Sequence, residues 1–281
     1  GNITSPIEDF YNNPVILFPD NLFSEKSLEA LSIISKKVKS QFNNGLYEKE
    51  IMCEHGNIWE FAKELNLICS DLIPYLEKNI YNSYLCVDKV YIYRTKIINN
   101  RESSYIWHYD NNPSEVIKNI IYLNNVNELN SPFEYFVDSL NRGVLGKCTR
   151  KGTEFWENAI NDSRVDKFVK EKLKKGTHFS RKVTGKFASG CSFNNNAIHR
   201  ANPVIKGYRD AINIRVKPTL KKTPIYISPN WTTSFESHGS VPRDPEISWY
   251  NQNNIPRRLF KIIYKFRDKI RTISKTIFIK K

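Results

Sequence analysis

Residues 185–218 read GKFASGCSFNNNAIHRANPVIKGYRDAINIRVKP, and this stretch is the clearest guide to the fold class. Its two ends, GKFASGCSF and YRDAINIRVKP, are rich in β-branched and aromatic residues, and turn residues separate them. Further runs of this kind between residues 86 and 228 are CVDKVYIYRTKI, SYIWHYD, EVIKNIIYLNNV, SPFEYF and TPIYIS. So many short strands in one stretch predict a β-sandwich or barrel of the jelly-roll kind.

Helical patterns flank these strands and occupy one gap between them. Apolar residues recur at near-helical spacing over residues 24–42 and 58–79, which predicts two packing helices. Residues 154–175 are expected to form an inserted helical segment, and the apolar run at 15–18 a short strand. The order of helices first and strands afterwards indicates a mainly β fold with flanking helices, and excludes a βαβ alternation.

The chain divides into one domain and a basic tail. We expect a single domain over residues 1–254, with its N-terminal helices in 1–85 and its β core in 86–228. Residues 255–281 hold ten Lys or Arg against one Asp, so they carry nine of the fourteen net positive charges. The body alone shows no basic motif of a known nucleic-acid-binding fold, and nucleic acid is therefore an unlikely partner.

The tail has the pattern of a basic amphipathic helix. Its apolar residues, spaced alternately by four and three, are Leu259, Ile263, Phe266, Ile270, Ile273 and Ile277. Such a helix can lie on an anionic membrane surface. The alternative is a terminal helix that packs against the body, and the scarcity of acidic residues favours the membrane surface over it.

The cysteines and the N-terminus bear on the cellular compartment. The five cysteines are scattered and never form a C-x-x-C pair, which is typical of reduced thiols in a cytoplasmic protein. No signal peptide is visible, and no apolar run approaches the roughly 20 residues of a membrane-spanning helix. We therefore expect a cytoplasmic protein that its tail can place at the inner membrane surface.

Three side chains have the types and spacing of a metal site. In an extended segment, residues two apart point the same way, so His108 and Asp110 can bind one metal ion. By itself this short motif also fits a turn at the end of a strand. His199 lies 89 residues after Asp110, in a predicted strand that a polar turn follows. Two His and one carboxylate, with the other positions open, suit a non-haem iron(II) oxygenase.

Two arginines are candidates for binding an anionic co-substrate. Arg209 lies ten residues after His199, at the start of the predicted strand YRDAINIRV. A guanidinium there can form a bidentate pair with a dicarboxylic acid. Arg215 lies six residues further on and, by alternation, on the same face. We favour Arg209 because of its spacing from His199 and keep Arg215 as the second candidate.

Together these residues resemble the Fe(II)/2-oxoglutarate-dependent dioxygenase superfamily, and most nearly its phytanoyl-CoA dioxygenase-like branch. The resemblance rests on His-x-Asp, a distal His, an Arg ten residues later, and the segments WHYD, IIYLNNVNELNSPFEYF and GKFASGCSFNNNAIHRANP. It covers residues 86–220 well and the N-terminal helices more loosely. The fold of that family, a double-stranded β-helix of the jelly-roll or cupin-like type, agrees with the strands expected above.

The resemblance implies roles for individual residues. His108, Asp110 and His199 match the family's iron ligands, and Arg209 matches the residue that binds the distal carboxylate of 2-oxoglutarate. The expected chemistry consumes O2 and 2-oxoglutarate and releases succinate and CO2. A carboxylate at Asp110 favours hydroxylation over halogenation, for which a small residue replaces it. The hairpin that ends in VDSLNRG departs from the family pattern, so the lid over the substrate is expected to differ.

Other residues near the motif are expected to line the pocket or to be structural. Those on the flanking strands are Tyr91, Tyr93, Arg94, Asn119 and Tyr122, and of these Tyr93 and Asn119 are retained as co-substrate contacts. Trp107, next to the first ligand, is expected to pack in the core. The histidines without a partner at ligand spacing, expected at the surface or at caps, are His55, His178 and His238.

We therefore expect an Fe(II)/2-oxoglutarate-dependent hydroxylase that acts on a small-molecule or a lipid- or sugar-linked substrate. Two alternatives remain open. One is a hydroxylase of protein side chains, which would need a wide groove beside the iron. The other is a catalytically silent double-stranded β-helix that binds a ligand, or a membrane through its tail.

Overall fold

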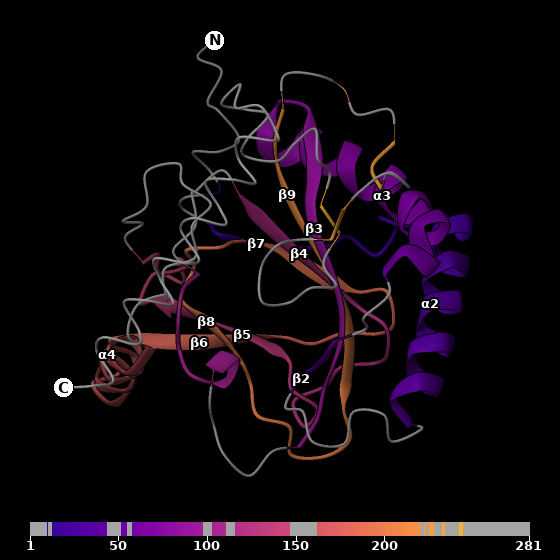
Figure 1. Ribbon diagram of the computed structural model, residues 1–281. Coiled ribbons are helices and arrows are strands. Elements are labelled where there is room, and N and C mark those ends of the chain that lie inside the picture. The colour runs from indigo at the N-terminus through magenta and orange to yellow at the C-terminus, as the bar shows by residue number, and fades with distance from the viewer. Residues whose placement is uncertain are drawn as a thin grey trace, which may run out of the picture.

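Two facing β-sheets and a helical layer make up the computed structural model of the protein (Figure 1). The residues that it describes are 10, 13–43, 52–54, 58–97, 103–110, 116–146, 162–219, 222, 225–227, 232–233 and 242–243. The helices cover one face of the larger sheet, and the smaller sheet lies on its other side. The predicted mainly β fold with flanking helices is confirmed.

The larger sheet has six strands, and all of its pairings are antiparallel. In spatial order they are β1 (Val15–Leu17), β7 (Gly190–Asn194), β4 (Ile117–Tyr122), β9 (Arg209–Pro218), β3 (Leu85–Thr95) and β2 (Met52–Glu54). The β-branched and aromatic runs thus form the central strands as predicted. The run TPIYIS is an exception, because residues 225–227 form no strand. Instead, the amide of Asn66 bonds both the N–H and the carbonyl of Ile227.

The smaller sheet has three strands: β6 (His178–Val183), β5 (Phe133–Asp138) and β8 (His199–Ala201). A single extended residue, His108, continues it beyond β8, because its backbone exchanges hydrogen bonds of 3.0 and 2.8 Å with that of His199. The predicted strand SYIWHYD is therefore wrong in extent. Its start forms a short 3-10 helix, η3 (Ser103–Tyr105), and pairing is confined to His108. A two-stranded ribbon, β10 (Thr232–Thr233) with β11 (Pro242–Arg243), is separate.

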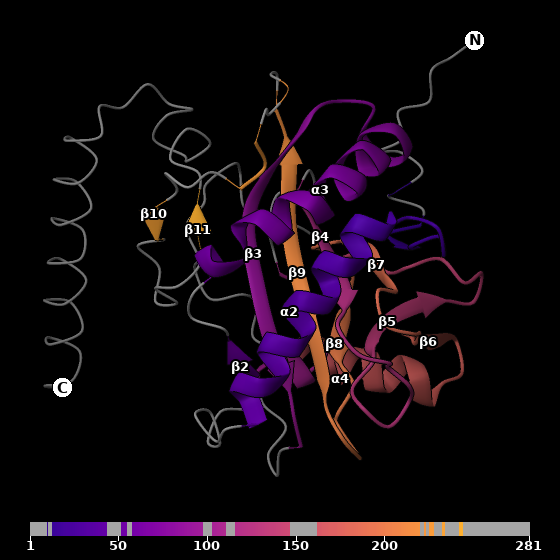
Figure 2. The same ribbon diagram turned by 90° about the vertical axis from the view of Figure 1, so that its right-hand side faces the viewer.

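The helical layer covers the outer face of the larger sheet, as both ribbon views show (Figures 1 and 2). It consists of α2 (Glu25–Asn43), η1 (Ile58–Phe61), α3 (Ala62–Leu76) and η2 (Glu77–Tyr81). These helices lie where the periodicity predicts them, and their buried apolar stripes share one core with β3, β4 and β9. The inserted helix α4 (Asp162–Lys174) lies beside the smaller sheet, within the predicted segment.

Side chains on β9 alternate strictly between the two faces of the larger sheet. Ile212, Ile214 and Val216 belong to the core under the helices, whereas Ala211 belongs to a second core between the two sheets. The odd-numbered residues from Arg209 to Lys217 therefore share the face that looks toward the smaller sheet. We call this the inner face, and it carries the candidate site.

Several expectations concern the ends of the chain and isolated residues. Trp107 is buried as predicted, and Cys69, Cys86 and Cys191 are free, buried thiols. Over the residues that the structure describes, every helix is too short or too polar to cross a membrane. The predicted basic helix at 255–281, together with His55 and His238, lies outside the described residues.

Candidate metal centre

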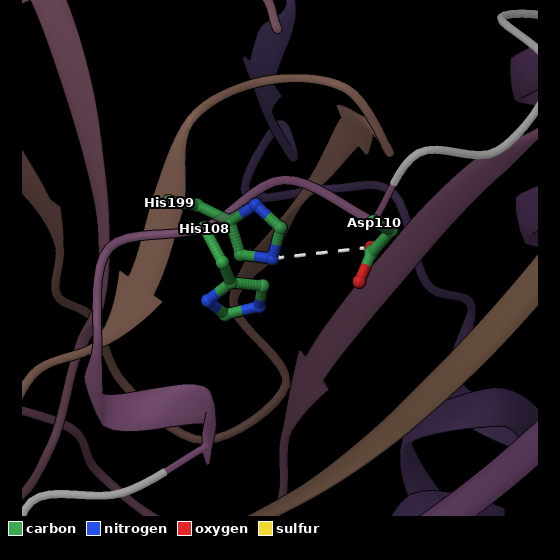
Figure 3. Close-up of side chains that lie close together, drawn as sticks. All are labelled: His108, Asp110 and His199. Atoms are coloured by element: carbon green, nitrogen blue, oxygen red, sulfur yellow. Dashed lines mark ion pairs between the residues drawn. The ribbon is translucent and has the colours of Figure 1, made fainter. Parts of the chain in front are cut away.

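Three side chains from two neighbouring segments meet at the edge of the smaller sheet. One potential ligand atom from each of His108, Asp110 and His199 lies within 4.8 Å of those of the other two. Figure 3 shows the two imidazole rings side by side, with the carboxylate facing them. The ring centroids are 4.4 Å apart, and His199 Nε2 lies 4.0 Å from Asp110 Oδ2. A backbone hydrogen bond of 2.9 Å, donated by Asp110 to Asn195, holds the carboxylate at this edge.

Both histidines are oriented by their own backbone. The Nδ1 of His108 lies 2.7 Å from the carbonyl oxygen of Ile106, and the Nδ1 of His199 lies 2.7 Å from that of Ala197. A carbonyl can only accept, so in each neutral ring Nδ1 carries the proton and Nε2 keeps its lone pair. Each of these hydrogen bonds fixes the tautomer in which Nε2 can bind a metal ion.

Burial and neighbouring charges set the protonation states of the cluster. Burial lowers the pKa of His199 to about 3, so its ring is neutral at pH 7. Burial would by itself raise the pKa of Asp110, but the charge of Lys118, with smaller effects of the two histidines, holds it well below its usual range. The Nζ of Lys118 donates to Asp110 Oδ2 over 2.7 Å. A neutral imidazole and an ionised carboxylate are the forms that bind a metal ion.

Aromatic rings enclose His199 and extend toward Arg209. The rings of Phe133 and Phe193 lie 5.4 and 4.9 Å from the imidazole of His199, centroid to centroid. The same apolar cluster contains Tyr93, whose ring centroid lies 5.8 Å from the Arg209 guanidinium carbon. The metal candidate and the arginine candidate therefore border one continuous apolar wall.

Arg209 is a buried cation with most of its hydrogen-bonding capacity unused. Its side chain is on the inner face, and the residue is 2% exposed. Nη2 donates to Thr95 Oγ1 over 3.3 Å, whereas Nε and Nη1 have no hydrogen-bond partner within the described part of the chain. A buried charge in this state is costly unless an anion joins it. An oxyanion could accept hydrogen bonds from these two nitrogens.

Comparison by sequence finds no matching protein-family model and no matching curated protein. Comparison of structures does find relatives. The carbocyclase SnoK of nogalamycin biosynthesis, described as non-haem and alpha-ketoglutarate dependent, is 14% identical over 78% of this chain and 87% of its own, with a TM-score of 0.50. The epimerase SnoN, in a complex with Fe3+, alpha-ketoglutarate and nogalamycin RO, is 12% identical over 75% and 82%, with a TM-score of 0.50. The chain has the fold of the 2-oxoglutarate-dependent oxygenases.

Within this 2-oxoglutarate oxygenase fold, the other predicted site residues occupy different places. Tyr93 is on the inner face, opposite Ala211 and next to Arg209. Arg215 is also on the inner face, but its guanidinium pairs with Asp88. Asn119 is on the helix-facing side of β4, where its amide donates to the carbonyl of Ile214 and accepts from a serine.

Two residues that sequence reasoning missed stand beside the candidate site. Lys118 pairs with Asp110, and Thr95 bonds to Arg209. Alternation along β4 could have placed Lys118 on the same face as Tyr122, but a lysine at the start of a strand ordinarily indicates a solvent-exposed edge. Thr95 could be recognised only from the register that sets it opposite Arg209. Of the remaining histidines, His178 stacks on Phe136, away from the cluster.

The low pKa of His199 predicts a pH-dependent stability of the metal-free protein. Below pH 6.5 the unfolded chain takes up a proton on this histidine, whereas the folded chain does so only near pH 3. We therefore expect the free energy of unfolding to fall as the pH drops from 7 to 4, by up to about 1.4 kcal/mol per pH unit from this residue. Urea unfolding at several pH values, compared between the parent and His199→Gln, isolates the contribution. Equal pH slopes in the two proteins would contradict the assignment.

Proposed function

We propose that the chain is an Fe(II)/2-oxoglutarate-dependent oxygenase that hydroxylates a small-molecule substrate and releases succinate and CO2. The observation that carries the proposal is the cluster of His108, Asp110 and His199, with both Nε2 lone pairs free to bind a metal. Two imidazoles and one carboxylate, with positions left open, suit Fe(II). The fold is the one on which related enzymes carry out this chemistry.

The unpartnered guanidinium of Arg209 supports 2-oxoglutarate as the co-substrate. Its free Nε and Nη1 would bond the distal carboxylate, with Thr95 holding the third nitrogen. Tyr93 and the neighbouring apolar wall would exclude water from the space between the arginine and the cluster. Iron and 2-oxoglutarate, when bound, would activate O2, which is the oxidant, while the chain binds and orients the reactants and keeps the site dry.

The proposed small-molecule substrate and the proposed hydroxylation are supported by different observations. SnoN is described in a complex with nogalamycin RO, a small molecule, and this favours a similar class of substrate here. The relatives include an epimerase and a carbocyclase, so the fold alone leaves the outcome of the oxidation open. We propose hydroxylation because Asp110 keeps the carboxylate that halogenating relatives replace.

The test is turnover of the co-substrate by the purified protein. With Fe(II), 2-oxoglutarate and air we expect slow succinate formation even without a substrate, and none when iron is omitted or replaced by Zn(II). Without oxygen, Fe(II) and 2-oxoglutarate together should produce a visible charge-transfer band that neither produces alone. A protein that binds Fe(II) but yields neither succinate nor the band is not a 2-oxoglutarate oxygenase.

A further inference from the structure

The backbone holds the two histidines of the candidate metal centre unequally. His199 belongs to β8, so it is paired with Tyr135 of β5 on one side and with His108 on the other. His108 is joined to the smaller sheet as an isolated residue, through two hydrogen bonds with His199 of 3.0 and 2.8 Å. The hydrogen bond that Asp110 donates to Asn195 fixes the chain on one side of His108. On the other side of His108 stands Trp107.

Trp107 and Arg200 each lie next to one of these histidines in the chain, and their side chains contact each other. Neighbouring residues of an extended segment point to opposite faces, so Trp107 and Arg200 lie on the face away from the metal cluster. The guanidinium carbon of Arg200 is 4.4 Å from the centroid of the Trp107 ring, which makes a cation–π contact. This contact joins the segment of His108 to β8 independently of the backbone bridge.

A buried carboxylate fixes the direction of the Arg200 side chain. Glu134 of β5 lies directly opposite Arg200 and accepts a hydrogen bond of 2.7 Å from its Nε. The side chain of Glu134 is 3% exposed and that of Arg200 is 19% exposed, so water has little access to the ion pair. A charge-assisted hydrogen bond of this kind orients the guanidinium, and through it the ring of Trp107. We call Trp107, Glu134 and Arg200 the clamp.

The tryptophan of the clamp is packed in the core between the smaller sheet and α4. Trp107 is 1% exposed, and its ring centroid lies 5.9 Å from that of Phe136. Both rings belong to one apolar cluster with Val165 and Val169 of α4. Side chains in such a close-packed interior have little room to shift. The clamp therefore connects His108 to a well-packed part of the fold.

We propose that Arg200 is a positioning residue of the metal centre. Through Trp107 it holds His108 where the Nε2 of this histidine can bind the same metal ion as His199. Arg200 does this from the opposite face of the smaller sheet and is not one of the cluster residues. The inference rests on the metal site of the proposed function and is independent of which substrate the protein takes.

The first test is the Fe(II) affinity of Arg200→Met, measured without oxygen by competition with a chromophoric chelator. Loss of groups that support metal ligands costs about 10- to 100-fold in affinity, so we expect binding at least about tenfold weaker than in the parent. Arg200→Lys keeps a cation near Glu134 and Trp107 and should recover most of the affinity. The control is Arg142→Met, which removes an exposed arginine paired with Asp138 of β5 and should change nothing.

A double variant separates positioning from stability. Arg200→Met leaves the buried carboxylate of Glu134 without the arginine that now pairs with it, and this alone should destabilise the fold. Glu134→Gln, Arg200→Met removes that charge and should regain much of the thermal stability. It still lacks the cation over Trp107, so its Fe(II) affinity should stay low. An affinity that recovers together with the stability would show that Arg200 is purely structural, and the inference would be wrong.

NMR of the Co(II)-loaded protein identifies the histidine that moves. Both rings carry a proton on Nδ1 and keep Nε2 for the metal, so the parent should show two exchangeable ring N–H signals with large paramagnetic shifts. Arg200→Met should keep one signal, because β5 still holds His199, and should lose or broaden the other, that of His108. Two unchanged signals in Arg200→Met would contradict the inference.

The binding data also tell failure of the inference from failure of the proposed function. If the parent binds Fe(II) and Arg200→Met binds it within about threefold of the parent, the inference alone is overturned. If the parent does not bind Fe(II), the proposed function and the inference fall together.

Discussion

Replacing Asp110 by Asn is expected to weaken Fe(II) binding by at least about 100-fold, because loss of groups that merely support metal ligands already costs about 10- to 100-fold. The substitution keeps the shape of the side chain but removes the hard anionic ligand. It also leaves the ammonium of Lys118, which now pairs with this carboxylate, uncompensated beside the metal. The dissociation constant can be measured on metal-stripped protein by competition with a chromophoric chelator.

The structure offers a control and a second variant for this experiment. His178→Gln removes a histidine that stacks on Phe136 outside the cluster, and should leave Fe(II) affinity unchanged. The double variant Asp110→Asn, Lys118→Met removes the repulsion as well as the ligand, and should recover part of the lost affinity. An affinity of Asp110→Asn within about threefold of the parent would exclude Asp110 as a ligand.

Much of the site follows from local patterns that a sequence displays directly. The two-residue spacing of His108 and Asp110 predicts that both side chains point the same way and can reach one metal ion. In the structure their ligand atoms do lie close together. Alternation along one strand predicts that Arg209 and Arg215 share a face, and the register of β9 with β3 confirms this. Helical periodicity predicts α2 and α3, because a stripe of apolar residues must pack on a core. Each of these inferences needs only residues close together in the chain.

What could not be predicted depends on pairings between distant residues. Arg215 and Asp88 are 127 residues apart, and a register shift in β3 next to Asp88 brings them together. Asn119 bonds to a carbonyl 95 residues away, which takes its amide to the helix-facing side. The pairing of Lys118 with Asp110 likewise depends on the backbone hydrogen bond that Asp110 donates to the distant Asn195. Strand propensity cannot supply such registers, since they are set by the packing of both faces.

Replacing Arg209 by Met is expected to weaken 2-oxoglutarate binding at least about 30-fold, since truncating one partner of a buried charge pair costs about 2 kcal/mol or more. Fe(II) affinity should not change, because the arginine is not among the cluster residues. The apoprotein should be at least as stable as the parent. The substitution removes a buried cation whose Nε and Nη1 have no partner among the described residues, while Met keeps much of the packing volume.

Arg215→Met is the matched variant, because Arg215 is the second candidate for the same carboxylate. It should leave 2-oxoglutarate affinity nearly unchanged and should destabilise the apoprotein, since Asp88 would keep a buried charge without its main partner. Thermal unfolding with Fe(II) in place, with and without saturating 2-oxoglutarate, measures both effects at once. The stabilisation by 2-oxoglutarate should disappear in Arg209→Met and persist in Arg215→Met. The reverse pattern would move the co-substrate carboxylate from Arg209 to Arg215.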